Sequence, residues 1–338
     1  MSPIPVTPQN GLISRVADSC IWFGRYLERS ESTARELQAT LHLALDGELS
    51  PRRCWFPMTV IAGEEAAMQK QHGDAAFEDG ELVQRYLVWD DDCGVSLRRS
   101  ISAARENARS IRDVLSSEVW EATNELHLWM TDGSAQLAWD TQRDEFYRRV
   151  RQSAQLSLGL LRSTMLHDCV LDFIWLGMLL ERIGQTARLL DVHHHVFSLE
   201  DRQHPMIETI VWVALLRAFS GLESFIKNMG QVTPDAVAAF LFGEPRFPRS
   251  IAYCVRSAYD RLNSLVAAEK GAPGQSALVR LHALDEWVRA TSSAPLKATE
   301  LHVMLTHVVD ESAAVFELIG TELLGHVDAP AVAVTPES

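Results

Sequence analysis

Cysteines are few in this chain, and none stands in a spacing typical of metal binding or redox chemistry. The 338 residues contain five cysteines and no C-x-x-C pair. An odd number of scattered thiols does not build a disulfide framework or a structural zinc site, and it is typical of a reducing compartment. We therefore expect a cytoplasmic protein that has no metal centre.

Long apolar runs are also missing. The most apolar stretch, residues 207–219, is interrupted by Glu208 and Arg217, whereas a helix that crosses a bilayer needs about 20 apolar residues. The first residues, MSPIPVTPQNG, contain neither the charged region nor the apolar region of a secretory signal. We expect no membrane span and no leader, with disordered ends at residues 1–12 and 327–338.

Positive charge is in the minority. The chain has 45 acidic and 31 basic side chains, which give a net charge of −14. This balance argues against a general surface for nucleic acid or anionic membranes. We therefore predict no nucleic-acid partner and no membrane partner.

Sequence motifs for nucleotides, metals and nucleophilic catalysis are absent. The chain has no P-loop, no H-E-x-x-H, no E-x-x-H for a di-iron bundle and no G-x-S-x-G. Residues 90–92 are three aspartates beside a turn, which we interpret as an acidic loop rather than a Mg²⁺ site. Residues 193–195 are three consecutive histidines, which cannot share one helix face and so favour a helix end over a metal site.

Strand-like alternation is missing too, and helical periodicity takes its place. In the first segment Phe23, Leu27, Ala34, Leu37 and Leu41 recur at intervals of three, four and seven, as in a helix with one buried face. The sequence therefore predicts an all-α protein. The expected helices cover residues 13–44, 57–72, 96–115, 118–131, 135–161, 167–194, 205–228, 233–241, 249–268, 275–291 and 297–323.

The most informative feature is a phrase that occurs twice. Residues 21–37 read IWFGRYLERSESTAREL and residues 174–190 read IWLGMLLERIGQTARLL, so that ten of 17 positions match at an offset of 153. A second block, residues 86–104, aligns with 240–258 at an offset of 154. We infer a tandem-duplicated helical bundle, with a first repeat at 13–162 and a second at 163–326 packed about a pseudo-twofold axis.

Both copies of this Glu-Arg phrase retain an adjacent Glu and Arg, and two interpretations of them are open. In the first, Glu28 pairs with Arg182 and Glu181 pairs with Arg29, buried where the two helices cross; such pairs specify register more than they stabilise. In the second, these side chains face a ligand in a shared pocket, and Glu28 is the candidate catalytic base.

Neighbours on the same helix face extend the candidate site. Arg25 and Arg35 line up with Glu28 at helical spacing. Gly24 lies four residues before Glu28, and Gly177 lies four before Glu181. A glycine at that spacing leaves room for another backbone or for a ligand.

A stripe of arginines occurs in the first repeat only. Arg105, Arg109 and Arg112 share one face of the predicted helix 96–115, whereas the aligned positions of the second repeat are Tyr259, Asn263 and Val266. Aligned guanidinium groups in an acidic protein suit a carboxylate, a phosphate or an acidic partner. The alternative is a solvated face or pairing with nearby acids, chiefly Glu106, Glu118 and Glu121.

Three phrases resemble one bacterial family. SRVADSCIWFGRYLERSESTAR (residues 14–35), AARENARSIRDVLSSEVWE (103–121) and LGMLLERIGQTARLL (176–190) are similar to the alpha-E family, an all-helical domain of unknown function named for a Glu-Arg motif. The last of these, which is the second copy of the Glu-Arg phrase, departs from the family pattern at Met178, where an arginine is expected. The matching positions are Ser14, Trp22, Gly24, Arg25, Glu28, Arg29, Arg35, Arg105, Glu106, Asn107, Arg109, Trp120, Glu121, Gly177, Glu181 and Arg182.

The resemblance implies partners. Members of that family are typically encoded beside a circularly permuted ATP-grasp protein, a transglutaminase-like protease and sometimes a proteasome-like peptidase. The leading hypothesis is therefore an accessory or binding subunit in an ATP-grasp-linked pathway that makes or modifies a peptide. It would hold an anionic substrate or an acidic peptide segment, while ATP and Mg²⁺ are bound by the partner. The alternatives are an enzyme that acts on an amino-acid-like substrate and a purely structural scaffold.

Overall fold

The computed structural model describes residues 14–46, 49–198, 205–269, 271–293 and 298–326. Within these ranges the chain forms α-helices, one short 3₁₀ helix and no strand, which confirms the all-α prediction. The two ends predicted to be disordered, 1–12 and 327–338, lie outside the described residues. The helices are α1 (Ser14–Asp46), α2 (Pro51–Ala62), α3 (Glu65–His72), η1 (Asp74–Glu78), α4 (Gly80–Trp89), α5 (Leu97–Ser110), α6 (Ser117–Thr131), α7 (Ser134–Thr141), α8 (Arg143–Thr164), α9 (Cys169–Ser198), α10 (Pro205–Ala218), α11 (Leu222–Met229), α12 (Pro234–Gly243), α13 (Ile251–Leu265), α14 (Gln275–Ser292) and α15 (Ala298–Glu322).

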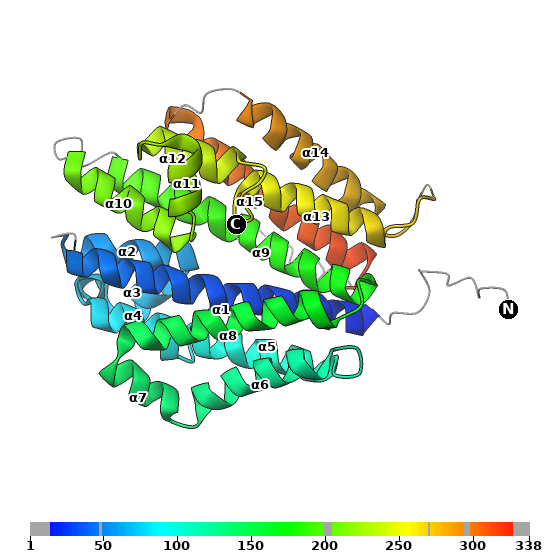
Figure 1. Ribbon diagram of the computed structural model, residues 1–338, viewed down its shortest axis with the longest axis horizontal. Coiled ribbons are helices and arrows are strands. Elements are labelled where there is room, and N and C mark those ends of the chain that lie inside the picture. The colour runs from blue at the N-terminus through cyan, green and yellow to red at the C-terminus, as the bar shows by residue number, and fades with distance from the viewer. Residues whose placement is uncertain (1–13, 47–48, 199–204, 270, 294–297, 327–338) are drawn as a thin grey trace, which may run out of the picture.

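Two long helices form the centre. α1 and α9 pack against each other, α5 and α8 flank α1, and α13 and α15 flank α9. In Figure 1 the helices α5 to α8 lie below this central pair, and α12 to α15 lie above it. Buried apolar side chains of the central pair and of both flanking sets belong to one continuous core, for example Phe23, Trp139, Ile174 and Phe240.

Several predicted helices are divided in the structure. The predicted helix 57–72 begins earlier, at Pro51, because proline suits the first turn of a helix. It ends at Gly63, whose φ of 74° belongs to the left-handed region that glycine adopts without strain. The predicted helix 135–161 is divided at Gln142. The predicted helix 205–228 is divided at the turn that contains Ser220, whose φ is 50°.

Two described helices, η1 and α4, lie outside the predicted set. The pair Asp79-Gly80 is typical of a turn, yet the Asp79 carboxylate accepts hydrogen bonds from the backbone N–H groups of Glu81 and Leu82 and so begins α4. An acidic side chain at this position satisfies the free donors of a first helical turn. The serines before α5 and α13 cap their helices in the same way: the hydroxyl of Ser96 accepts from Arg99 N at 3.4 Å, and that of Ser250 accepts from Tyr253 N at 3.1 Å.

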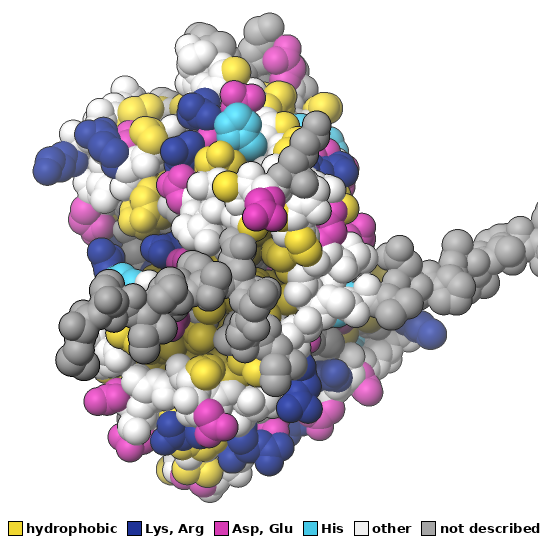
Figure 2. Space-filling model, turned by 90° about the vertical axis from the view of Figure 1, so that its right-hand side faces the viewer, with side chains coloured by type: hydrophobic (Ala, Val, Ile, Leu, Met, Phe, Trp, Pro, Cys, Tyr) yellow, Lys and Arg dark blue, Asp and Glu magenta, His cyan; other side chains and the backbone are white. Residues whose placement is uncertain are grey.

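One end of the molecule shows how its surface is divided. α8 leads into α9 at the right-hand end in Figure 1, and Figure 2 views that end with hydrophobic side chains near its middle and charged ones above and below. Within the described ranges, no individual helix combines the length and apolar character of a bilayer span. Among the described helices, only the bent pair Thr209–Ala218 and Leu222–Met229 has the length and apolar character of a span when taken together, across a bend of 118°.

Candidate functional site at the crossing of two Glu-Arg helices

α1 and α9 touch through their backbones at two glycines. A Cβ atom placed on Gly24 would lie 2.0 Å from the carbonyl oxygen of Ile174, and one placed on Gly177 would lie 2.1 Å from that of Ile21. Glycine is required at both positions because real Cβ atoms do not approach a carbonyl so closely. At each glycine, the space that a side chain would fill is therefore occupied by the backbone of the other helix. We call this contact the Glu-Arg crossing.

Glu28 is fully buried at the crossing and completely paired. Arg182 donates to its carboxylate from Nε at 2.8 Å and from Nη2 at 2.6 Å. Arg249 adds a bond at 3.1 Å, and so does the hydroxyl of Ser32 at 3.1 Å. Burial alone would raise the pKa of Glu28, but the attraction of Arg182 and Arg249 with these hydrogen bonds lowers it to about 2.

Glu181 has the corresponding arrangement. Arg29 donates from Nε at 2.7 Å and from Nη2 at 3.0 Å, and Arg25 donates from Nε at 2.9 Å. Gln185 completes the shell with a bond of 3.1 Å. Burial opposes ionisation, yet the two arginines outweigh it and lower the pKa of Glu181 to about 2. Both predicted cross-pairs, Glu28 with Arg182 and Glu181 with Arg29, are thus confirmed.

Arg249 was not anticipated from the sequence. It lies in the turn between α12 and α13, and its Nη2 reaches Glu31 at 2.7 Å while its Nη1 reaches Glu28. Gln155 of α8 also donates to Glu31, at 3.0 Å. The segment GEPRFPR carries no periodicity that would place an arginine at the crossing. Its role depends on the path of the turn.

Arg35 and Arg188 occupy the same position in the two Glu-Arg phrases and extend to different neighbours. Arg35 is buried, forms an ion pair with Glu31 and donates to the hydroxyl of Ser220. Burial and the nearby Arg249 lower the pKa of Arg35 to about 8. Arg188 instead donates from Nε to the carbonyl of Ile61, at the end of α2, at 3.2 Å.

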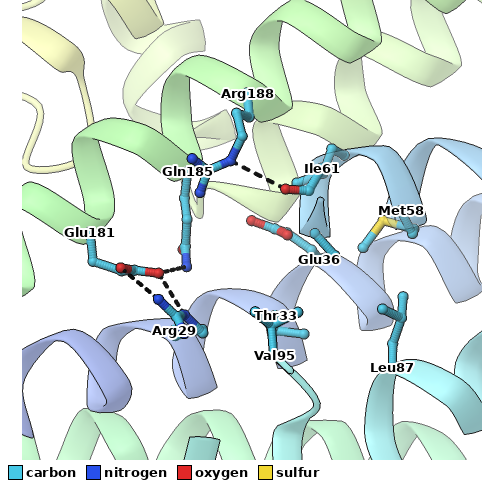
Figure 3. Close-up of a pocket in the computed structure, with 11 residues that line it drawn as sticks. Arg29, Thr33, Glu36, Met58, Ile61, Leu87, Val95, Glu181, Gln185 and Arg188 are labelled. Atoms are coloured by element: carbon cyan, nitrogen blue, oxygen red, sulfur yellow. Dashed lines mark hydrogen bonds and ion pairs between the residues drawn. The ribbon is translucent and has the colours of Figure 1, made fainter. Parts of the chain in front are cut away.

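A small cavity lies beside the crossing, between α1, α2 and α9 (Figure 3). We call it the Glu36 cavity, and its volume is about 70 Å³. Arg29, Glu181 and Gln185 form one wall, in which Glu181 accepts hydrogen bonds from both Arg29 and Gln185. The lining residues are Arg29, Thr33, Glu36, Met58, Ile61, Ala62, Leu87, Val95, Glu181, Gln185 and Arg188.

An acidic and a basic side chain, Glu36 and Arg188, face this cavity without a hydrogen bond or ion pair between them. Glu36 is 7% exposed, and its carboxylate has no hydrogen bond or ion pair with any described residue. Burial raises the pKa of Glu36 to about 8, although Arg188 and Arg249 oppose the shift. The terminal nitrogens of Arg188 likewise have no acceptor within the described part of the chain. In Figure 3 the Glu36 carboxylate points into the space between Arg188 and Arg29.

The sequence held one signal for these two residues. Both Glu-Arg phrases have an arginine at the same position, Arg35 in the first and Arg188 in the second, and this repetition indicates a shared role. Glu36 has Leu189 at the equivalent position, so the repeat pattern gave it no support. A charged residue on a helix is normally solvated, and only packing shows that Glu36 is buried.

The arginine stripe is a separate surface. Arg105 donates to Asn124 at 3.2 Å and to Glu106 at 2.5 Å, and Arg109 pairs with Glu106 at 2.6 Å. Pairing with Glu106, which is part of the alternative to an anion site, is therefore present. None of these side chains lines the Glu36 cavity.

The predicted helix 96–115 is wrong at its end. α5 stops at Ser110, so Arg112 lies in the following turn rather than on the helix face. It still joins Arg105 over the ring of Trp120, at 5.6 and 5.4 Å from the ring centroid. Asn107 donates to the carbonyl of Ala103, which is a local bond within α5.

The run of aspartates at residues 90–92 and the first of the histidines at residues 193–195 make contacts with nearby residues of the chain. Asp90 accepts from the backbone N–H of Asp92 at 2.8 Å, and Asp91 pairs with Arg98. His193 is buried with its Nδ1 at 3.1 Å from the carbonyl oxygen of Leu189, and burial lowers its pKa to about 4. Across the described ranges, no group of three or more His, Cys, Asp or Glu side chains could hold a metal ion.

Comparison with known proteins adds one family and two relatives. The uncharacterized proteins Mb2597 of Mycobacterium bovis and MT2643 of Mycobacterium tuberculosis are each 24% identical over 278 residues, which cover 78% of this chain and 30% of the relative. The chain thus spans less than a third of the length of these relatives. No solved structure matches. The Alpha-E family, described as a predicted alpha-helical domain with a conserved ER motif, matches residues 12–323. The chain therefore belongs to the Alpha-E family.

Proposed function

We propose that the chain is a binding subunit that holds the amino and carboxylate groups of a small amino-acid-like ligand in the Glu36 cavity. The observation that carries this proposal is the pair Glu36 and Arg188. They are an acid and a base that face one cavity, and neither the carboxyl group nor the terminal guanidinium nitrogens meet a described partner.

A buried carboxyl group without a partner keeps its proton rather than ionise, and a buried guanidinium group without an acceptor is costly, so both favour a ligand that completes them. An ammonium group beside Glu36 would restore the ionised carboxylate, and a carboxylate beside Arg188 would accept charge-assisted hydrogen bonds. A space of about 70 Å³ holds a few water molecules or one small polar group. The amino-acid head group matches both the size and the charges.

The Glu-Arg pairs supply the wall of this cavity. Glu181 and Arg29 line it, but each already satisfies the other. They therefore act as rigid positioning residues, and a preorganised site loses less conformational entropy when a ligand binds.

Binding is favoured over catalysis by Glu28. The carboxylate of Glu28 is 0% exposed, lies outside the cavity lining and accepts from Arg182, Arg249 and Ser32. With a pKa of about 2 it remains ionised and fully hydrogen-bonded near neutral pH. A general base needs a free lone pair within reach of the substrate proton.

The scaffold is proposed to be a tandem duplication about a pseudo-twofold axis. The reciprocal contacts of Gly24 with Ile174 and of Gly177 with Ile21 support this proposal, as do the reciprocal ion pairs. Leu189 stands at the position equivalent to Glu36, so the second Glu-Arg phrase has no carboxyl group there. One side of a symmetric framework has thereby become specialised.

The proposed pathway is the one that the family resemblance implies. An ATP-grasp ligase would bind ATP and Mg²⁺ and join the ligand to a peptide, while this chain presents the ligand. Co-purification from a host that expresses both proteins would test the association. Recovery of the ligase with the wild-type chain is the expected result, and its absence would separate this chain from the pathway without affecting the cavity.

Calorimetric titration with glycine, alanine and glutamate tests the cavity itself. We expect saturable binding of at least one of them, weakened roughly tenfold or more by Glu36→Gln or Arg188→Gln because each removes a charge-assisted contact. Glu125→Gln is the matched control, since Glu125 is exposed on α6. Absence of binding by all three amino acids, or equal affinity in the cavity variants, would contradict the proposal.

A structural scaffold is the second candidate function. The complete pairing of Glu28 and Glu181 favours it, because neither requires a ligand. In that case water would occupy the Glu36 cavity, and Glu36→Gln would change stability without changing the binding of any small molecule.

A further inference from the structure

We propose a second ligand site, for an anion carried on an apolar body, in a cavity between α8, α9 and α13. This Trp175 cavity has a volume of about 480 Å³, within the range of roughly 300–1,000 Å³ that is typical of small-molecule sites. It is distinct from the Glu36 cavity, and the proposal does not depend on the function assigned above. Its lining residues are Leu158, Arg162, His167, Leu171, Trp175, Met178, Leu179, Arg182, Pro248, Tyr253, Ser257 and Arg261.

The charges that line this cavity have one sign. It contains three arginines and one histidine but no aspartate or glutamate. Arg162 is exposed, and its guanidinium has no acceptor within the described part of the chain. Arg261 donates from one nitrogen to Asp172 at 2.7 Å, which leaves its other donors for a ligand. In an acidic protein such a local excess of guanidinium groups selects an anion.

Arg182 lines the same cavity but has a different role from Arg162 and Arg261. Its donors already bind Glu28 and the carbonyl of Pro248, at 3.1 Å. It therefore connects the Glu-Arg crossing to the wall of the Trp175 cavity rather than offering a free donor.

The remaining lining favours an apolar body. Leu158, Leu171 and Leu179 contribute aliphatic surface, and the half-buried ring of Trp175 contributes an aromatic face. The hydroxyl groups of Tyr253 and Ser257 have no partner among the described residues, so they add two polar contacts. A largely apolar lining with a few convergent polar groups is typical of small-molecule sites.

The equivalent tryptophans of the two Glu-Arg phrases have different surroundings, and only the second lines this cavity. Trp22 is the equivalent of Trp175, and its ring packs edge-on against Phe316 at 5.5 Å. Arg25 lies over both rings, at 4.7 and 4.2 Å from their centroids. The position of Arg25 is Met178 in the second phrase. The surroundings of Trp22 are thus filled by protein, whereas Trp175 lines a cavity.

A matched pair of fluorescent probes tests the proposal: 8-anilino-1-naphthalenesulfonate, which is anionic, and N-phenyl-1-naphthylamine, which has the same rings without the charge. We expect the anionic probe to bind the 338-residue chain at one saturable site. Arg162→Ala should weaken the anionic probe roughly tenfold, because it removes a charge-assisted contact, and should leave the neutral probe unchanged. Ser257→Phe, which places a bulky ring in the cavity, should weaken both.

Arg148→Ala is the control for Arg162→Ala, because Arg148 lies on the same helix and pairs with Glu145 at the surface. Its affinities should equal those of the wild type. Arg162 is exposed, so its replacement does not endanger folding, and a melting curve checks the Ser257 variant. No saturable binding of the anionic probe, or an affinity that Arg162→Ala leaves unchanged, would overturn the proposal.

Discussion

Gly24 of α1 lies directly against the carbonyl of Ile174 in α9, so closely that a methyl group in place of its hydrogen would stand 2.0 Å from the oxygen. The reciprocal contact of Gly177 with Ile21 shows that two backbones, rather than two side-chain layers, meet at the crossing. This close approach is what brings each glutamate within reach of the arginine on the other helix.

The close approach makes Gly24→Ala destabilising. The two helices would have to separate, and overpacking of this kind typically costs about 1–3 kcal/mol or more. Gly159→Ala is the matched control, because Gly159 is also within a helix but a Cβ atom placed on it would have no neighbour within 4 Å. That change should stabilise the protein by about 0.5–1 kcal/mol. Chemical denaturation compares the two, and similar effects of both would contradict the close packing.

Removal of one member of the buried pairs should be costly. Glu28→Ala leaves Arg182 and Arg249 without their shared carboxylate in a buried place. The expected loss is about 3–5 kcal/mol, measured by denaturant unfolding. Arg109→Ala provides the contrast, because its pair with Glu106 is exposed and such pairs contribute about 0–1 kcal/mol. Equal losses in both variants would refute the structural role of the crossing.

The same pairs make the protein sensitive to acid. The pKa of Glu28 and of Glu181 is about 2 in the folded protein, below the ordinary value of 4.5. The folded state then binds fewer protons than the unfolded state, so the pairs stabilise it above pH 4.5 and lose this effect as the pH falls toward 2. We expect Glu28→Gln to flatten the acid limb of the stability curve. An unchanged acid limb would show that other groups dominate.

Glu36 should have the opposite effect on stability. Its folded pKa of about 8 lies above the ordinary 4.5, so the folded state holds a proton that the unfolded chain has released. Stability contributed by Glu36 therefore declines as the pH rises from 4.5 toward 8. Glu36→Gln should remove this decline and raise the melting temperature at the alkaline end. A variant less stable than wild type at that end would contradict the burial of an unpaired carboxylate.

Ligand binding at Glu36 should release a proton. An ammonium group beside the carboxylate favours its ionised form and so lowers its pKa. Titrations of glycine, alanine and glutamate at neutral pH in buffers of different ionisation enthalpy would measure proton release directly. The release should disappear in Glu36→Gln, while Glu125→Gln should behave as wild type. Binding without any proton release would place the ligand elsewhere.

The repeated phrase predicted the crossing because a Glu and an Arg retained at one offset can satisfy each other only if their helices meet. Helical periodicity predicted the all-α class because apolar residues at helical spacing share one face, as Phe23 and Leu27 do on the buried face of α1. The sequence did not reveal Arg249, whose position depends on the path of an irregular turn. It did not reveal the burial of Glu36 either, because the helices beside this side chain, α2, α9 and α10, come from distant parts of the sequence.

The reciprocal pairing has a consequence for dividing the chain. Residues 165–168 join α8 to α9 and offer an obvious place to cut. Yet Glu28 has its bidentate arginine on the far side of that cut, and so has Glu181. Each fragment would carry one partner of each ion pair and one of the two glycines that contact the other helix. The two pieces would behave as the subunits of an obligate heterodimer, which fold by finding each other rather than one at a time.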